Sequence, residues 1–246
     1  MTAPVFVVEH FDAGGGGRYV LDGPEGRHAV SVKRLRAGED VVLTDGSGRW
    51  ADCVVLGTEG KDRLVLQLDS VHEEPAEQPR VTVVQALPKG DRGELAVETM
   101  TEVGVDAIVP WAAARCITQW KGERGAKALG KWRATAREAG KQSRRVRFPE
   151  VAEAATTKQV AALLAGAEFA AVLHESGDAP LATAELPSTG EIVLVVGPEG
   201  GVAPEELALF EEAGAKAYRL GRSVLRTSTA GTAAAAVLLA RTGRWS

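Results

Sequence analysis

Hydrophobic and polar positions alternate in short runs over the first part of the chain. The runs at residues 5–8, 41–44, 50–56 and 64–71 have the two-residue period of half-buried strands, with glycine- and aspartate-bearing turns between them. Residues 14–17 are consecutive glycines, which we expect to form a flexible loop. This pattern predicts a small N-terminal β-barrel, followed by a polar, proline-bearing linker at 73–79.

The second part of the chain has a different pattern, in which unbroken apolar runs alternate with segments of helical period. The apolar runs are rich in β-branched residues, as expected for strands buried on both faces. Strands are predicted at 81–87, 105–109 (ended by Pro110), 169–173, 192–196 and 216–220, and helices from 94 to Gly104, at 130–145, at 158–164, from Pro204 to Gly214 and from Thr227 onward. The alternation predicts an α/β fold, so we expect a β-barrel domain at 1–74 and an α/β domain at 75–246.

Two of the predicted strands end in glycine-bearing loops that lead into helices. The first loop is Gly197-Pro198-Glu199-Gly200-Gly201, where glycine permits positive φ and a close approach of a ligand to the backbone. The second loop opens at Gly221. In open α/β sheets ligands bind at the carboxyl ends of the strands. The alternative is that these are two ordinary connections that use glycine only for turns.

The loops exclude the common phosphate-binding motifs. The dinucleotide pattern G-x-G-x-x-G is absent, and the next strand ends in Leu220-Gly221-Arg222 without the acidic residue that binds the ribose. The P-loop pattern with its lysine is absent as well. A ligand held by main-chain amides and carbonyls, such as an adenine or a methionine moiety, suits these loops better.

Composition is that of an ordinary globular protein, with 45% hydrophobic and 25% charged residues. The chain has no secretory signal pattern and no apolar run long enough to span a bilayer, so we expect a cytoplasmic protein. Cys53 and Cys116 are isolated and the four histidines are scattered, so we expect reduced thiols and no metal site.

Charge is distributed unevenly along the chain. The net charge is −4, but residues 121–147 hold ten Lys/Arg against two Glu, a local excess of +8 that leaves −12 elsewhere. Such asymmetry is typical of a surface that faces a polyanion. The alternative is a basic helix face that is only solvated, although it has few of the interleaved acids that support such a helix.

The motifs together carry a family resemblance. VVGPEGG at 195–201, followed by RLGRSVLRTSTAG at 219–231, resembles the C-terminal signature of the SPOUT-class RNA methyltransferases. Within that class the chain is most similar to the family that methylates N3 of a uridine in 16S ribosomal RNA (RsmE-type), because it also has the LPKGDR block at 87–92. Near the N-terminus, His28, Val32, Arg34 and Gly38 match that family's PUA-like domain.

The resemblance implies a fold, a cofactor and partners. It implies a deep trefoil knot in the α/β domain, S-adenosyl-L-methionine as methyl donor, 16S rRNA of the small ribosomal subunit as substrate, and a homodimer with a shared site. Three loops are expected to line the cofactor site, one of them after the strand at 169–173. The cofactor-binding residues it implies are Leu173, His174, Val196, Gly197, Gly200, Gly201, Leu220, Gly221, Val224 and Leu225.

Methyl transfer to N3 of uracil requires loss of a proton and stabilisation of the charge that develops on O2 and O4. A cationic donor beside the methyl group supplies that stabilisation in the manner of an oxyanion site, and Arg226 is our candidate. Thr229 offers a hydroxyl at the start of the last helix. Glu199 is a candidate base, with loop ordering as its alternative role; His174 is a second candidate, with a plain loop histidine as the alternative. A base held in an RNA stack would have to be turned out.

The RNA-binding residues predicted from the resemblance and from charge lie in three groups. His28, Lys33, Arg34 and Arg36 belong to the N-terminal domain, Lys89, Arg92 and Arg115 to the α/β domain, and Arg144, Arg145 and Arg147 to the basic segment. The alternative for the N-terminal group is a cap that only stabilises the barrel. The chain departs from the family pattern at Lys33, Thr99 and Lys141.

Three rival functions remain open at this point. A SPOUT ribose 2′-O-methyltransferase acting on tRNA or rRNA would share the knot and cofactor, but the N-terminal module and the LPKGDR block argue against it. A non-catalytic RNA-binding protein of the same fold would be favoured if Gly197, Gly200, Gly201 or Arg226 were missing, and all are present. A nucleotide-dependent enzyme is weakened by the absent lysine and ribose acid.

Overall fold

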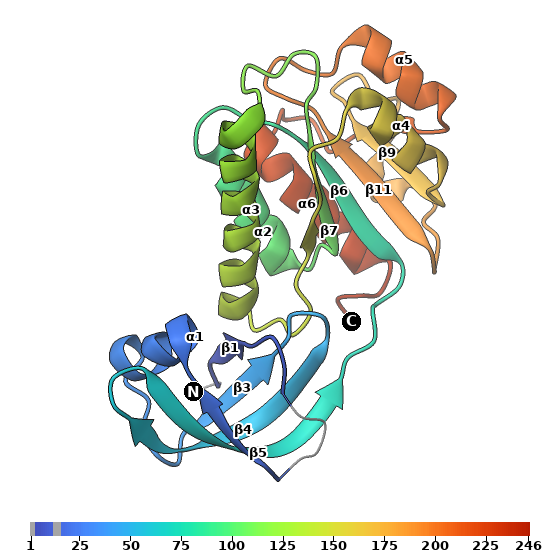
Figure 1. The fold of residues 1–246 in the computed structure, drawn as a ribbon. Coiled ribbons are helices and arrows are strands. Elements are labelled where there is room, and N and C mark those ends of the chain that lie inside the picture. The colour runs from blue at the N-terminus through green and yellow to red at the C-terminus, as the bar shows by residue number, and fades with distance from the viewer. Residues whose placement is uncertain (1–2, 12–15) are drawn as a thin grey trace. The chain divides into compact units, whose positions relative to one another are not determined.

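The structure, a computed structural model, describes residues 3–11 and 16–246 (Figure 1). The first two glycines of the loop expected at 14–17 lie outside the described residues. The chain divides into two compact units, one of Met1–Ala76 with Gly140–Phe148 and one of Glu77–Ala139 with Pro149–Ser246. The domain boundary expected between 74 and 75 stays a prediction, since this division also assigns 140–148 to the first unit.

The first unit is built on a five-stranded sheet in the order β1-β3-β4-β5-β2. Only β1 and β3 pair in parallel; the other pairs are antiparallel. Phe6, Leu43, Leu64 and Leu66 are fully buried at its centre. The strands are β1 Val5–Val7, β2 Arg18–Leu21, β3 Asp40–Thr44, β4 Arg49–Glu59 and β5 Arg63–Glu73.

The sequence-based expectation of a small barrel is refined to a half-barrel. In the described part of the unit β1 and β2 are the two sheet edges and do not pair with each other. A short helix, α1 (Gly23–Arg27), continues into a π-helical turn, η1 (His28–Val32), which the strand pattern did not predict. Ala29 of this turn is buried in the core of the half-barrel.

The segment 140–148 packs within the first unit. Val146 O accepts hydrogen bonds from Thr44 Oγ1 (2.8 Å) and Gly48 N (3.0 Å). The Lys141 Nζ atom lies 3.0 Å from Glu25 Oε1, and Lys141 is only 9% exposed. The sequence pattern placed the basic residues of the helix predicted at 130–145 on its outer face. This was wrong for Lys141, because a carboxylate within the unit neutralises its charge.

The second unit is an α/β layer structure around a seven-stranded sheet in the order β10-β12-β9-β11-β6-β7-β8. Every adjacent pair is parallel, as the alternation of strands and helices predicted. The strands are β6 Arg80–Ala86, β7 Ala107–Trp111, β8 Glu150–Val151, β9 Phe169–Leu173, β10 Ala179–Pro180, β11 Glu191–Val196 and β12 Lys216–Arg219. Pro110 lies inside β7 instead of ending it, and its carbonyl accepts a hydrogen bond from Ala155 N.

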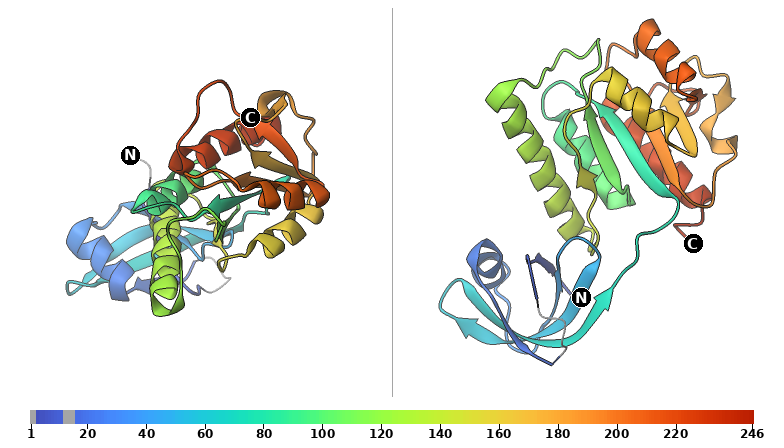
Figure 2. Two further views of the ribbon diagram at one scale, coloured as in Figure 1. Left: turned by 90° about the horizontal axis from the view of Figure 1, so that it is seen from above. Right: turned by 45° about the vertical axis from the view of Figure 1, so that its right-hand side comes forward.

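Helices cover both faces of this sheet (Figures 1 and 2). One face carries α2 (Arg92–Val103), α3 (Gly122–Gln142) and α6 (Thr227–Arg241), whose core includes Met100, Trp132 and Leu238. The other face carries α4 (Thr157–Ala165) and α5 (Pro204–Glu212), packed around Trp111 and Phe210. A 3-10 turn, η2 (Leu181–Thr183), follows β10.

Helix boundaries follow the local signals in the sequence. Pro204 occupies the first position of α5, and Gly214 just beyond that helix has a φ of +92°. Thr156 and Gln159 form a capping box at the start of α4. Helix α3 begins earlier than predicted and ends at Gln142, before Arg144 adopts a φ of +62°.

Membrane and metal features are absent from the described ranges 3–11 and 16–246. No helix there is long and apolar enough to cross a bilayer, and no cluster of His, Cys, Asp and Glu could hold a metal ion.

Burial raises the pKa of the Cys53 thiol to about 12, so this cysteine stays protonated at neutral pH.

Candidate functional site

The topology of the second unit brings three chain segments to one place. Along the chain the strands come in the order β9, β10, β11, β12. In the sheet, however, β11 lies on one side of β9 and β12 on the other. Since the strands are parallel, their carboxyl ends at Leu173, Val196 and Arg219 meet at the same edge. A change in the direction of strand order of this kind is where open α/β sheets bind ligands.

A cavity of about 570 Å³ lies at this edge. It is lined by the loops that follow β9, β11 and β12, together with Arg92 and Arg115. Its volume is in the range of pockets that hold small organic ligands. All ten residues predicted to bind the cofactor line it: Leu173, His174, Val196, Gly197, Gly200, Gly201, Leu220, Gly221, Val224 and Leu225.

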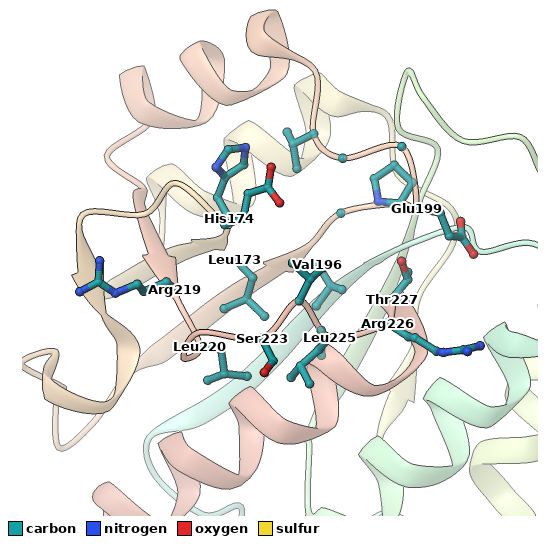
Figure 3. A pocket seen from close by; sticks show the side chains of 18 of the residues that line it. Leu173, His174, Val196, Glu199, Arg219, Leu220, Ser223, Leu225, Arg226 and Thr227 are labelled. Carbon is teal, nitrogen blue, oxygen red and sulfur yellow. The ribbon is translucent and has the colours of Figure 1, made fainter.

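The cavity is apolar in the middle and polar at its sides. Figure 3 shows the side chains of Leu173, Val196, Leu220 and Leu225 gathered near its centre. Arg226 extends to the side where Glu199 lies, and Arg219 extends away on the opposite side. Such a lining suits a ligand with a flat or aliphatic apolar part and charged ends.

The structure gives a separate reason for the presence of a glycine at each of the three positions 197, 200 and 201. Gly201 has a φ of +74°, which side chains rarely adopt. A Cβ atom on Gly197 would lie 2.9 Å from Val202 Cγ2, and one on Gly200 would lie 3.2 Å from Arg115 Cβ. Of the three glycines, Gly201 thus uses the positive φ that glycine permits, whereas Gly197 and Gly200 lie in close contacts that a side chain would disturb.

Glu199 is tied to the loop that follows β6. Its Oε1 accepts a hydrogen bond from Lys89 N (3.3 Å) and lies 3.7 Å from Arg92 Nη1. His174 is tied to its own loop, because its Nδ1 accepts a hydrogen bond from Ser176 N (3.2 Å). Both contacts favour the loop-ordering roles that the sequence left as alternatives.

Arg226 is the residue before the first turn of α6. Its side chain lines the cavity, and its carbonyl accepts hydrogen bonds from Thr229 N (2.9 Å) and Thr229 Oγ1 (3.2 Å). Thr229 is not among the residues that line the cavity; Thr227 is. The helix start thus fixes the backbone of Arg226, while its guanidinium remains available to a ligand.

Sequence reasoning missed several residues of the site. Arg222 and Ser223 line the cavity from the loop after β12, and their position between Gly221 and Val224 was the available signal. Glu206, to which the sequence analysis gave no site role, is 6% exposed and bonded to three segments. Nothing in the local sequence indicates those partners.

The predicted RNA-binding residues of the first unit lie around the π-helical turn. Lys33, Arg34 and Arg36 are exposed, and His28 is half-buried, edge-on to the Phe6 ring at 6.0 Å between ring centroids. Arg34 has a φ of +57°, uncommon for a residue with a side chain. Exposure of all three cations leaves them available to phosphates.

The arginines of the segment 140–148 differ from one another. Arg144 is exposed, whereas Arg145 is half-buried. Arg147 Nη2 donates to Glu74 O (2.6 Å), and the Arg147 guanidinium packs so closely on Gly48 that a Cβ there would lie 2.2 Å from Nη2. This geometry favours a structural role for Arg147 and an external role for Arg144.

The departure at Thr99 also has a structural explanation. Thr99 Oγ1 lies 2.6 Å from Thr232 Oγ1, so this side chain joins α2 to α6. It is half-buried and does not line the cavity. A threonine here therefore takes part in helix packing.

One cluster in the first unit has the residue types of a hydrolytic triad without its geometry. Ser70 Oγ lies 2.8 Å and Asp52 Oδ2 lies 3.2 Å from His72 Nε2. A triad uses the two ring nitrogens for different partners, whereas both contacts here fall on the same nitrogen. The cluster therefore does not support hydrolysis.

Comparison with protein families matches nearly the whole chain. Residues 75–239 match the RNA methyltransferase domain, and residues 21–69 match the RNA methyltransferase PUA domain. The ribosomal RNA small subunit methyltransferase E of Mycobacterium bovis is 47% identical over 92% of this chain and 87% of that protein. The protein of the same name from Bacillus subtilis is 29% identical over 86% of each chain.

Solved structures agree with this assignment. A ribosomal RNA small subunit methyltransferase E from Neisseria gonorrhoeae, bound to S-adenosyl methionine, is 28% identical over 98% of each chain with a TM-score of 0.85. A putative methyltransferase from Legionella pneumophila, in complex with the same cofactor, is 27% identical over 98% of each chain with a TM-score of 0.84. A PUA-like half-barrel and a SPOUT parallel-sheet domain thus make up the chain, and it belongs to the family of the ribosomal RNA small subunit methyltransferases E.

Proposed function

We propose that this protein is an S-adenosylmethionine-dependent methyltransferase that modifies N3 of a uridine in 16S rRNA of the small ribosomal subunit. The observation that carries the proposal is the cavity formed by the ends of β9, β11 and β12, whose lining residues lie within the part of the chain that matches the RNA methyltransferase domain. Relatives named ribosomal RNA small subunit methyltransferase E align over most of the chain.

The residues of the cavity fit this cofactor. Leu173, Val196, Leu220 and Leu225 supply an apolar centre for an adenine or a thioether, and bare backbone at Gly197 and Gly221 supplies amides and carbonyls. When bound, the cofactor supplies an electrophilic methyl group. The chain itself has to hold that group, orient the uracil and stabilise the charge on the base.

Arg226 is our candidate for charge stabilisation. The first turn of α6 holds its backbone, and its side chain lines the cavity, so the guanidinium lies near the place where a substrate would bind. A fixed cation stabilises charge that develops on uracil O2 and O4 without reorganisation. Thr229 supports this role by binding the Arg226 carbonyl, and Glu199 supports it by ordering the loops beside the cavity.

RNA binding is proposed for exposed and half-buried cations of both units. Arg92 and Arg115 line the cavity, and Lys89 is exposed beside it, so they are suited to phosphates near the target base. Lys33, Arg34, Arg36, Arg144 and Arg145 are suited to phosphates farther along the RNA. His28 is suited to a base or sugar contact.

We also propose that the protein acts in the cytoplasm as a homodimer, with a trefoil knot in its second unit. Val224 is 80% exposed and Leu225 39% exposed beside the cavity, and a second copy of the chain would cover them. The knot is a prediction from family resemblance. Analytical ultracentrifugation of the protein at micromolar concentration tests the dimer, and a single monomeric species would contradict it.

The function is tested by incubating the protein with labelled S-adenosylmethionine and small ribosomal subunits. We expect one methyl group on 16S rRNA, and digestion to nucleosides followed by mass spectrometry should place it on uracil N3. Label on a ribose hydroxyl would move the assignment to the 2′-O-methyltransferases. Cofactor binding without any transfer to subunits or naked rRNA would favour a non-catalytic RNA-binding protein.

A further inference from the structure

A buried carboxylate joins three segments beside the cavity without lining it. Glu206, in the first turn of α5, is 6% exposed. Its Oε1 accepts hydrogen bonds from Ala114 N (2.8 Å) and Thr157 Oγ1 (2.9 Å), and its Oε2 accepts one from Ala203 N (3.2 Å). A buried carboxylate is tolerated when its lone pairs are satisfied in this way.

The contact with Ala203 is half of a capping box at the start of α5. Ala203, the residue before that helix, has no side chain that could bind the free helix amides. Glu206 instead reaches back to the Ala203 amide and so fixes the exit of the glycine loop. The carboxylate therefore determines where residues 197–203 leave the cavity wall.

The other contacts fix the loop that carries Arg115. Ala114 and Arg115 follow β7, and the amide of Ala114 is held by Glu206. Thr157, at the start of α4, donates a hydrogen bond to Glu206 Oε1, the oxygen that also binds Ala114 N. The Thr157 hydroxyl also accepts a hydrogen bond from Trp111 Nε1 (3.3 Å). Trp111 ends β7, so both ends of the turn between β7 and Arg115 are fixed.

Arg115 and the glycine loop are in direct contact at the cavity. Arg115 Nη1 donates to Gly200 O (3.1 Å), and a Cβ on Gly200 would lie 3.2 Å from Arg115 Cβ. Both Arg115 and Gly200 line the cavity, whereas Glu206 does not. Any shift of the Ala114–Arg115 backbone relative to α5 therefore changes the shape of this wall.

We propose that Glu206 is a positioning residue of the cofactor site, which holds the Arg115 loop and the glycine loop in register and so presents the wall of the cavity to S-adenosylmethionine. This inference rests on the proposed function, because the ligand is the cofactor named there. Glu206 touches no ligand and acts through Ala114 and Ala203.

The test compares Glu206→Gln with its exposed neighbour variant Glu205→Gln in the full-length protein. Both remove one negative charge from the first turn of α5, but only Glu206→Gln replaces a buried acceptor by an N–H group. We expect the Kd for S-adenosylmethionine, measured by calorimetry, to rise about tenfold or more in Glu206→Gln. In Glu205→Gln it should change less than about twofold.

A double-mutant cycle with Arg115→Met separates positioning from general stability. If Glu206 acts by holding the Arg115 loop, the effects of Glu206→Gln and Arg115→Met on Kd should be clearly less than multiplicative. Multiplicative effects, or a lowered melting temperature with an unchanged Kd, would overturn the inference.

A milder variant covers the case in which Glu206→Gln does not fold. Thr157→Val keeps the carboxylate and removes one of its donors, and we expect the Kd to rise about threefold. An unchanged Kd in folded Thr157→Val would then overturn the inference. Failure of the wild-type protein to bind the cofactor would instead overturn the proposed function itself, so the two failures are distinguishable.

Discussion

The two edges of the parallel sheet in the second unit are built in opposite ways. At the carboxyl edge, the ends of β9, β11 and β12 surround a cavity, with positive φ at Gly201 and Gly221 and an exposed Val224. At the amino edge, a buried arginine, Arg244, forms ion pairs and hydrogen bonds beside the starts of β6 and β7. The two edges of one sheet thus serve different purposes, binding at the carboxyl edge and stability at the amino edge.

The amino edge is centred on Arg244, near the C-terminus. Its guanidinium lies 2.5 Å from Asp106 and 2.6 Å from Glu77, and its side chain is only 6% exposed. Asp106 also accepts a hydrogen bond from Val81 N (2.8 Å) at the start of β6. Burial lowers the pKa of Arg244, but the hydrogen bonds to Asp106 and Glu77 outweigh it and raise the pKa overall.

The contrast shows that an arginine contributes to fold stability at the amino edge and to ligand binding at the carboxyl edge. Arg244 is buried and paired, so its removal leaves a carboxylate without its partner. Arg226 lines the cavity and is exposed, so its removal leaves the fold intact and affects only what the cavity holds. The following variants test that distinction.

The largest effect is expected from Arg244→Met. Because Asp106 would be left buried and unpaired, we expect the free energy of unfolding in urea to fall by about 3–5 kcal/mol. Arg80→Met, whose side chain is 39% exposed and pairs with Glu150, is the control and should cost less than about 1 kcal/mol. Equal losses in both variants would show that the amino edge is not specially stabilised by Arg244.

Arg226→Ala should affect chemistry without affecting stability. We expect the rate of methyl transfer to fall by about 10²–10³, with melting temperature and cofactor Kd unchanged, since one charge-stabilising donor is lost. Arg222→Ala, in the same loop and also lining the cavity, is the matched control and should retain most activity. Turnover by Arg226→Ala at the wild-type rate would remove Arg226 from the mechanism.

In the first unit, Arg144→Ala and Arg147→Ala test the same distinction between an arginine that binds a ligand and one that stabilises the fold. Because Arg144 is exposed, its loss should reduce the slope of log K against log salt for rRNA binding by about 0.7–0.9. Arg147 is bound to Glu74 O, so its loss should lower stability and leave the slope nearly unchanged. The opposite pattern would return Arg147 to the RNA-binding surface.

The smallest effect concerns Glu168, at the amino edge beside β11. Hydrogen bonds from the Glu191 and Glu168 backbone amides lower the pKa of this carboxyl. Its stabilising effect is therefore present above the unfolded carboxyl pKa of about 4.3 and is lost as pH falls through the lower folded value. Glu168→Gln should be slightly less stable than wild type at pH 7, and in urea unfolding the difference should shrink as pH falls below the unfolded carboxyl pKa. Parallel pH profiles would contradict this.

Much of the fold was predictable because its signals are local. The β-branched runs predicted β6, β9 and β11 to within one or two residues, and Pro204 and Gly214 marked the ends of α5. Strand β2 and the π-helical turn at His28–Val32 were missed, because they are short and lack a clear period.

For the site, the sequence identified the loops but not their arrangement. All ten residues expected around the cofactor line one cavity, since strand ends and glycines are visible along the chain. Lys141 was misplaced because its partner, Glu25, is 116 positions away. The contact of Gly200 with Arg115 was not predictable, because these two residues are far apart along the chain.

By itself, therefore, the sequence determined the alternation of strands and helices, the two kinds of domain and the glycine loops, because periodicity and turn chemistry depend on neighbouring residues. Only the tertiary structure decided that β11 and β12 flank β9 and that Glu206 binds Ala114 and Thr157, 92 and 49 positions away. Hydrogen bonds over such separations depend on which surfaces pack together, and local pattern does not encode that choice.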